Sequence, residues 1–357
     1  MRIILISYGT LDMIHKRVGH FALCVLAVIL SLPTSLRAAG EVNIYSFRQP
    51  QLIQPIIGRF QAVTGIAANV VYADKGLVER LKAEGANSPA DVILTADVGN
   101  LNDLVEADVL QGVLSEILEA NIPYQYRDPE GRWFGLTMRA RVIYASRERV
   151  SPDTISRYED LADPRFKGRV CSRSAKQVYM VSFIASRIAE WGEPQTERWL
   201  EGVKSNLARK PQGNDRAQAK AIAEGECDVA LGNTYYYGAM QANPEERAWA
   251  EATILIFPNQ ADRGTHVNIS GAAVTSAAKN RAEAVRLLEF LSGDEAQGLY
   301  AEQNYEYPVK PGVEPSAIVA SWGPFKADTI PLVEVAQERA AASRLVDRVG
   351  FDEAGGS

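Results

Sequence analysis

The stretch EVNIYSFRQPQLIQPIIGRFQAVTGIAANVVYADKGLVERLKAEGANSPADVILTAD, from Glu41 to Asp97, decides the fold. Three of its segments (41–47, 67–74 and 90–97) are short, and the last of them is rich in β-branched residues, so we predict strands there. The two segments between them have the apolar spacing of amphipathic helices, and each ends at a glycine. This alternation predicts an α/β fold with a parallel sheet.

The alternation continues along the chain and predicts a second unit of the same kind. Segment 216–240 is typical of a helix, then a strand, then a cluster of tyrosines at the end of that strand. Parallel α/β sheets bind ligands at the carboxyl ends of their strands. Tyr45, Asp97 and Tyr235–Tyr237 all follow predicted strands, so we expect them to face a cleft. Segment 265–276 is then predicted to lead back to the first unit.

The first 38 residues have the pattern of a cleaved secretory signal. Basic residues precede an apolar run from Phe21 to Leu32, and small residues follow it up to Ala38 and Ala39. The run is shorter than a transmembrane helix requires. We therefore expect an exported protein that is cleaved after Ala38 or Ala39.

Without residues 1–38 the chain is acidic, with 34 basic and 43 acidic residues and a formal net charge of −9. An acidic exported chain argues against binding to nucleic acid or to anionic membrane surfaces. The roughly 320 residues that remain are long for one compact core and suit two domains.

Few soft metal ligands remain beyond residue 38. Cys171 and Cys227 fall on predicted strands of the same region, so they form either a disulfide, which export permits, or two buried thiols. The remaining histidine is His266. This set is too small for the usual zinc or copper sites, so a bound metal ion would need mainly oxygen ligands.

The stretch GNTYYYGAM (232–240) places three tyrosines in a row. A phenol has an ordinary pKa of about 10, and a trivalent cation can displace its proton to give a hard anionic ligand. Tyr235 and Tyr236 would point to opposite faces of an extended segment, so their convergence needs a turn, which the Gly, Asn and Thr residues around them favour. Tyr179 precedes a predicted helix of the same unit. The alternative is a cluster that packs at a strand end or stacks on a sugar.

Three arginines indicate an anion site. Arg139 and Arg141 are two residues apart and share a face if their segment is a strand, and Arg48 follows the first strand. The guanidinium fork matches a planar, bidentate anion such as a carboxylate or carbonate. The alternative is ion pairing at the surface.

Seven segments carry a family resemblance: YSFRQPQLIQP, PADVILTAD, RDPEGRWFGLTMRARVIYAS, YEDLADPRFKGRVCSRSA, AIAEGECDVALGNTYYYG, THVNISGAAV and FKADTIPL, in this order. Together they resemble the periplasmic ferric-iron-binding proteins of bacterial ABC importers, over essentially all of the chain after the signal. NTYYYG and RWFGLTMRARV are the more specific parts. ISGAAV is shared more widely among extracellular solute-binding proteins.

The resemblance implies a two-domain periplasmic-binding-protein fold of type II, in which two α/β sheet domains are joined by hinge strands with a ligand cleft between them. We expect one lobe from 40–138 with 263–313, a second from 139–262 with 314–350, and a flexible tail over 351–357. The implied protein is not an enzyme. It is a periplasmic monomer that carries iron(III) to an ABC permease in the inner membrane.

The resemblance also assigns the metal ligands. In that family an Asn-x-Tyr-Tyr motif supplies two iron-binding phenolates, which fall on Tyr235 and Tyr236. The third ligand is the tyrosine after the Arg-Ser strand, which is Tyr179. Tyr237 would then be a neighbouring ring that packs against the site.

The sequence departs from many family members at one point. They carry His-Tyr after the YSxR motif, where this chain has Gln-Pro at 49–50. The variant resembles the subgroup in which a synergistic anion, carbonate, completes the coordination sphere. Arg48 would contact that anion, with Gln49 and one or both of Arg139 and Arg141 nearby.

Two other functions stay open. A solute-binding protein for a small organic anion or another metal complex would keep the fold and change the cargo, and the missing His-Tyr pair favours it. An exported enzyme would need catalytic groups, and the sequence has no Gly-x-Ser-x-Gly elbow and no Cys-His pair in a suggestive context.

Overall fold

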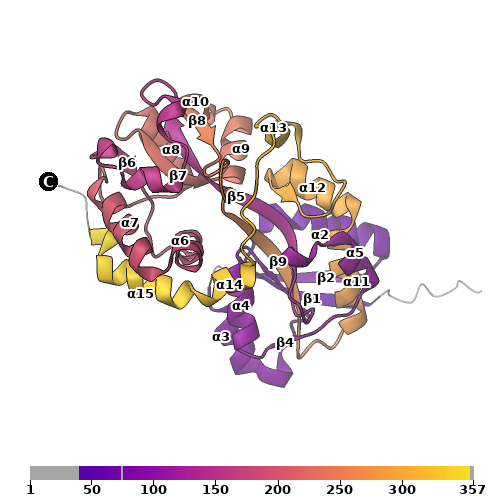
Figure 1. Ribbon diagram of the computed structural model, residues 1–357. Coiled ribbons are helices and arrows are strands. Elements are labelled where there is room, and N and C mark those ends of the chain that lie inside the picture. Colours follow the sequence, from indigo (N-terminus) through magenta and orange to yellow (C-terminus); the bar gives the residue numbers. More distant parts are fainter. Residues whose placement is uncertain (1–39, 74, 354–357) are drawn as a thin grey trace, which may run out of the picture. The chain divides into compact units, whose positions relative to one another are not determined.

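The computed structural model describes residues 40–73 and 75–353 (Figure 1). The signal expected over residues 1–38 lies outside these ranges, as do the last four residues of the expected tail. Among the helices of the described residues, none has the length and the hydrophobicity that a membrane crossing needs.

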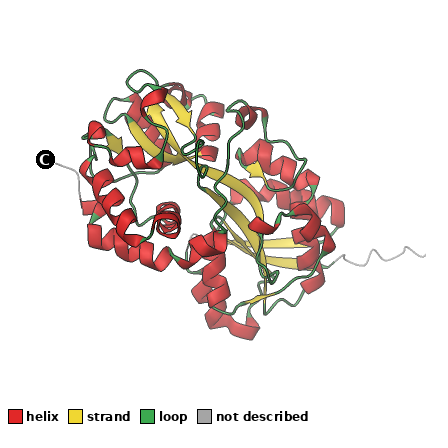
Figure 2. Ribbon diagram, in the orientation of Figure 1, coloured by secondary structure: helices red, strands yellow, loops and turns green. Residues whose placement is uncertain are grey.

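Ten strands in the described ranges form one mixed sheet (Figure 2). The order along its main path is β2-β1-β3-β9-β5-β7-β6, and β4 pairs with β9 while β8 and β10 pair with β5. The strands are β1 Glu41–Ser46, β2 Ala67–Tyr72, β3 Val92–Thr95, β4 Leu110–Gln111, β5 Phe134–Ser146, β6 Val170–Cys171, β7 Val229–Asn233, β8 Thr253–Ile256, β9 Val267–Thr275 and β10 Tyr307–Pro308.

The sheet is parallel only at its two ends. β1 is parallel to β2 and β3, and β6 is parallel to β7, as the strand–helix alternation predicts. The long strands β5 and β9 run antiparallel to each other, and they pair antiparallel with β7 and β3 respectively. The parallel pairing predicted from the alternation is thus found at the two ends of the sheet, and the antiparallel strands β5 and β9 connect these ends.

Helices pack on the outside of the strands (Figure 2). They are α2 Pro50–Thr64, α3 Leu77–Glu84, α4 Val98–Glu106, α5 Glu116–Asn121, α6 Val178–Trp191, α7 Glu193–Ser205, α8 Asp215–Ala223, α9 Thr234–Ala242, α10 Arg247–Glu251, α11 Arg281–Ser292, α12 Asp294–Asn304, α13 Ala317–Ala320, α14 Leu332–Gln337 and α15 Arg339–Val349. Local sequence explains several boundaries: α2 begins with Pro50 and ends at Gly65, whose φ of 71° is left-handed.

The apolar core is divided along β5. Phe134 and Leu136 pack in a cluster with β1, α2, α11 and α12, whereas Ile143 packs in another with α6, α7 and α15. Ala140 and Val142 face a third cluster, which includes Tyr144 and Tyr237. The change from one cluster to the next falls close to residue 138, where we expect the first lobe to end.

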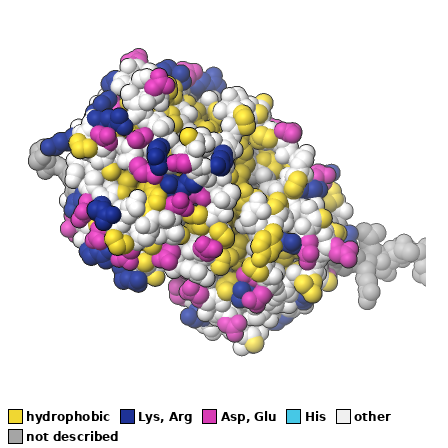
Figure 3. Space-filling model, in the orientation of Figure 1, with side chains coloured by type: hydrophobic (Ala, Val, Ile, Leu, Met, Phe, Trp, Pro, Cys, Tyr) yellow, Lys and Arg dark blue, Asp and Glu magenta, His cyan; other side chains and the backbone are white. Residues whose placement is uncertain are grey.

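On the face of the molecule shown in Figure 3, acidic and basic side chains are intermixed.

Two further features concern the cysteine pair and the expected C-terminal tail. Cys171 and Cys227 form a disulfide with a Cα–Cα distance of 5.8 Å, which ties β6 to the chain entering β7. The expected tail starts with an ordered 3₁₀ turn, Phe351–Glu353. Phe351 is buried in the α6–α7–α15 cluster, and Asp352 accepts hydrogen bonds from Ser174 and Ala175. These contacts hold the first part of the expected tail in place.

Candidate metal centre

Three phenols converge on one wall of a cleft. Oη of Tyr235 lies 3.5 Å from Oη of Tyr179, although the two residues are 56 positions apart in the sequence. The rings of Tyr235 and Tyr236 lie 4.1 Å apart between centroids, at an interplanar angle of 33°. All three side chains line the same cleft, which has a volume of about 450 Å³. The structure thus brings together the three tyrosines singled out in the sequence.

The tyrosines stand at the beginnings of two helices. Tyr179 is in the first turn of α6, where Gln177 caps the helix by accepting a hydrogen bond from the Tyr179 N–H. Tyr235 and Tyr236 are in the first turn of α9, which follows β7 directly. The positive end of a helix dipole favours negative charge nearby. Both helices therefore place phenols where a phenolate is stabilised.

The expected turn around the tyrosines is absent from this part of the structure. Gly232 lies within β7 and Gly238 within α9, so helical geometry, and not a turn, brings Tyr235 and Tyr236 to the same side. A Cβ on Gly232 would meet the Tyr144 ring at 2.2 Å, and one on Gly238 would meet Tyr305 Cβ at 2.6 Å. These glycines are needed for close packing.

Tyr237 points away from the cleft into the protein interior. Its hydroxyl donates to the carbonyl oxygens of Ala250 and Thr253, at 2.9 and 3.1 Å. Its ring packs against Tyr144 and Trp322. The third tyrosine of the run is thus a packing ring.

Burial keeps the phenols of Tyr235 and Tyr236 protonated. It raises the pKa of Tyr235 well above the ordinary value of 10, and the neighbouring oxygens of Tyr179, Tyr236 and Asp215 raise it further. Burial and the Tyr179 phenol likewise raise the pKa of Tyr236. At neutral pH these groups hold their protons until a cation displaces them.

Arginines surround the phenol rings. The guanidinium carbons of Arg139 and Arg173 lie 5.3 and 5.6 Å from the centroid of the Tyr179 ring, and that of Arg216 lies 5.6 Å from the Tyr236 ring. Sequence reasoning missed Arg173 and Arg216. Neither stands at a motif spacing from the tyrosines, so no signal in the sequence pointed to them.

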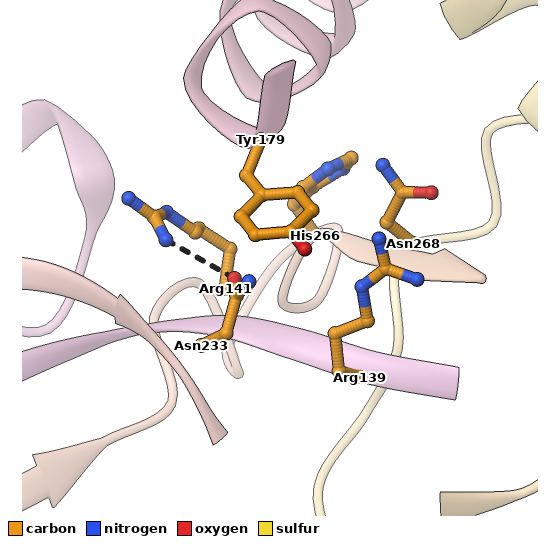
Figure 4. A pocket seen from close by; sticks show the side chains of 6 residues that line it. All are labelled: Arg139, Arg141, Tyr179, Asn233, His266 and Asn268. Carbon is orange, nitrogen blue, oxygen red and sulfur yellow. Dashed lines mark hydrogen bonds between the residues drawn. The ribbon is translucent and has the colours of Figure 1, made fainter. Parts of the chain in front are cut away.

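Arg139 and Arg141 lie on either side of Tyr179, but only Arg139 reaches the cleft (Figure 4). Arg141 is bonded to Asp215 at 2.8 Å and to Asn233 Oδ1 at 3.1 Å. Its carboxylate partner is fully buried, and Arg173 donates to the other oxygen of that carboxylate at 2.7 Å. Arg141 therefore does not line the cleft. It belongs to a network of Arg141, Asp215 and Arg173 that supports the start of α9.

Arg48 and Gln49 also line the cleft. Gln49 is exposed, whereas Arg48 is 4% exposed and is held by Glu306 through both terminal nitrogens, at 3.2 and 2.8 Å. Arg48 also donates to the hydroxyl of Ser270. Glu306 was not foreseen, because it lies 258 residues from Arg48 in the sequence.

Comparison with known proteins gives one consistent result. The family model for bacterial extracellular solute-binding proteins matches residues 87–322. Iron uptake protein A1 of Synechocystis is 46% identical over 315 residues, which is 87% of each chain. The chain belongs to the bacterial extracellular solute-binding protein family.

Solved structures agree with this assignment. The apo ferric ion-binding protein A of Pasteurella haemolytica has a TM-score of 0.84 and 54% identity, over 87% of this chain and 98% of that one. A Trichodesmium protein (IdiA, FutA), solved in complex with iron and citrate, has a TM-score of 0.84 and 42% identity, over 87% of this chain and 100% of that one. The expected type II periplasmic-binding-protein fold is confirmed.

In this solute-binding protein the strand ends contribute unequally to the cleft. Asp97 lines it and caps α4, and it accepts hydrogen bonds from Ser182 on α6 and Asn268 on β9, both at 2.9 Å. Tyr45 is buried elsewhere, with its hydroxyl bonded to Glu84. The expectation that Tyr45 faces the cleft is wrong, since its side chain packs under α3.

The donor set of the cleft is dominated by oxygen. In residues 40–73 and 75–353, no three His, Cys, Asp or Glu side chains are grouped so that they could hold a metal ion. His266 lines only a small cavity behind Tyr179, of about 10 Å³, the size of one water (Figure 4). Burial and nearby guanidinium groups hold the pKa of His266 well below its usual range, so its imidazole is neutral.

Proposed function

We propose that this solute-binding protein captures ferric ion between the phenolates of Tyr179, Tyr235 and Tyr236. The observation that carries the proposal is the convergence of three partly buried phenols on one cleft wall. Ferric ion is a hard cation that prefers anionic oxygen, and three phenolates balance its charge. The names of the relatives, which are iron uptake and ferric-binding proteins, support the same cargo.

An exogenous anion completes the coordination in this proposal. Three phenolates leave open positions around an octahedral ion, and the cleft is far larger than a bare ion requires. Arg48, Gln49 and Arg139 line it, and the Ser270 hydroxyl accepts hydrogen bonds from both arginines. Guanidinium groups suit a planar anion such as carbonate. We leave Arg141 out of this site, because it does not line the cleft and is already paired with Asp215.

The route of delivery follows from the family. An ion and anion that touch both walls favour a closed state, because a ligand biases a conformation only through differential contacts. The two expected lobes would close by bending of β5 and β9. The closed protein, as a monomer in the periplasm, would then dock on an ABC permease that opens the cleft.

The visible spectrum tests the proposal. Metal-free protein without residues 1–38 receives ferric citrate and bicarbonate, and a ferric–tyrosinate charge-transfer band should appear. The Tyr235→Phe, Tyr236→Phe double variant should lose the band. Tyr124→Phe, which changes an exposed tyrosine outside the cleft, should keep it. A colourless wild type whose thermal stability does not change would contradict the proposal.

A second candidate cargo is a small organic anion or a preformed metal complex. Three guanidinium groups and several amides line a cleft that could take a polycarboxylate. A relative was solved with iron and citrate together. Calorimetry with citrate alone and with ferric citrate separates the candidates: heat with citrate alone favours the organic anion.

A further inference from the structure

Arg48 lines the cleft, and most of its guanidinium group is already engaged by other residues of the protein. Glu306 Oε1 lies 3.2 Å from Arg48 Nη1, and Glu306 Oε2 lies 2.8 Å from Nη2. Both side chains are about 95% buried. The guanidinium also lies 5.6 Å from the centroid of the Tyr300 ring and donates to Ser270. The charge, one edge and one face of the guanidinium are therefore already satisfied within the protein.

This pairing bears directly on anion binding. A carboxylate and a carbonate present the same planar, two-oxygen edge to a guanidinium fork. Glu306 occupies the edge formed by the two terminal nitrogens. In the described residues, Nε of Arg48 is the one nitrogen of this side chain that lacks a hydrogen-bond partner. An incoming anion must either displace the carboxylate or bind through Nε beside a negative charge.

We infer that Glu306 is a built-in competitor for the anion at Arg48, an inference that rests on the proposed function. In the metal-free protein the Arg48–Glu306 pair is neutral overall, so Arg48 itself holds no free anion. A ferric ion at the tyrosines offers the anion open coordination positions, and this direct bond to the metal overcomes the competition. Glu306 thus makes anion binding at Arg48 depend on the metal.

Bicarbonate titrations of the iron-loaded protein test this role. In Glu306→Gln, which keeps the shape of the side chain and removes its charge, the bicarbonate concentration for half-maximal colour should fall at least about tenfold. Glu306→Asp keeps the charge and should retain the wild-type requirement. Glu295→Gln removes a carboxylate that pairs with Arg59 at the surface, and it should behave as the wild type.

A second measurement needs no iron. Metal-free wild-type protein titrated calorimetrically with bicarbonate should give no binding heat at millimolar concentration, whereas metal-free Glu306→Gln should bind. Anion binding by the metal-free wild type, or the same half-saturation in Glu306→Gln and wild type, would overturn the inference. A wild type that takes no colour from iron at any bicarbonate concentration would instead show that the proposed function fails.

Discussion

At the scale of single residues, the site depends on phenols that are kept neutral until a cation arrives. Tyr235 is buried next to two other phenols and to Asp215, and each of these neighbours opposes a negative charge on it. The N-terminus of α9 and the guanidinium group of Arg173, which favours a charge on Tyr236, act in the opposite direction. The phenols of Tyr235 and Tyr236 are therefore neutral in the metal-free protein, and in the proposed function they become phenolates when a highly charged ion replaces their protons.

Proton release is the first prediction at this scale. The raised pKa of Tyr235 and of Tyr236 means that both are protonated at pH 7, so iron binding must release their protons. The apparent affinity should then fall about tenfold per pH unit for each proton displaced as the solution becomes more acidic. A pH-stat titration measures the release directly. Tyr235→Phe should release one proton fewer than wild type, and equal release would contradict the account.

At the scale of elements, the junction between β7 and α9 positions two of the three tyrosines that we propose as ligands. α9 begins one residue after β7 ends, so the strand fixes the direction of the first helical turn. Asp215 supports this junction, since it accepts from the Asn233 backbone N–H and from Arg141, both at 2.8 Å. The glycines on either side of the tyrosines let Tyr144 and Tyr305 pack tightly against it.

Two helical glycines provide a matched prediction. Gly238→Ala places a Cβ 2.6 Å from Tyr305 Cβ and should destabilise the protein by about 1–3 kcal/mol. Gly298→Ala, in α12, meets nothing within 4 Å and should stabilise it by up to about 1 kcal/mol. Urea unfolding of the metal-free proteins gives both values. Equal effects of the two substitutions would show that Gly238 is not needed for packing.

Many of the helices and strands could be predicted from the sequence, because they depend on local patterns. The alternation of strands and helices and the position of the tyrosines after a strand are periodic or local features. The direction of β5 and β9 and the helical start at Thr234 could not be predicted, since they depend on pairing across the sheet. Glu306 could not be found either, because its role comes from a contact 258 residues away.

At the scale of the whole molecule, β5 and β9 connect the two parallel ends of the sheet. Along β9, Val267 packs in the cluster that contains Tyr237, and Ala272 and Val274 pack in the cluster around β1. β5 is divided in the same way. Two strands that pass between separate cores are suited to bending, because each core can move as a unit.

Closure of the cleft is the prediction at this scale. In small-angle scattering, the radius of gyration should fall when iron and bicarbonate are added together, since both walls then contact the ligand. The Tyr235→Phe, Tyr236→Phe variant should show no change under the same conditions. A radius that stays constant in the coloured wild-type protein would contradict the hinge motion and leave the tyrosine site intact.

The most direct measurement is a crystal structure of the iron-loaded protein with anomalous data collected at the iron absorption edge. We predict one strong anomalous peak within bonding distance of the phenol oxygens of Tyr179, Tyr235 and Tyr236. A peak bound to surface carboxylates, or a peak in the cleft that Tyr179 does not touch, would contradict the claim that three phenolates hold one ferric ion.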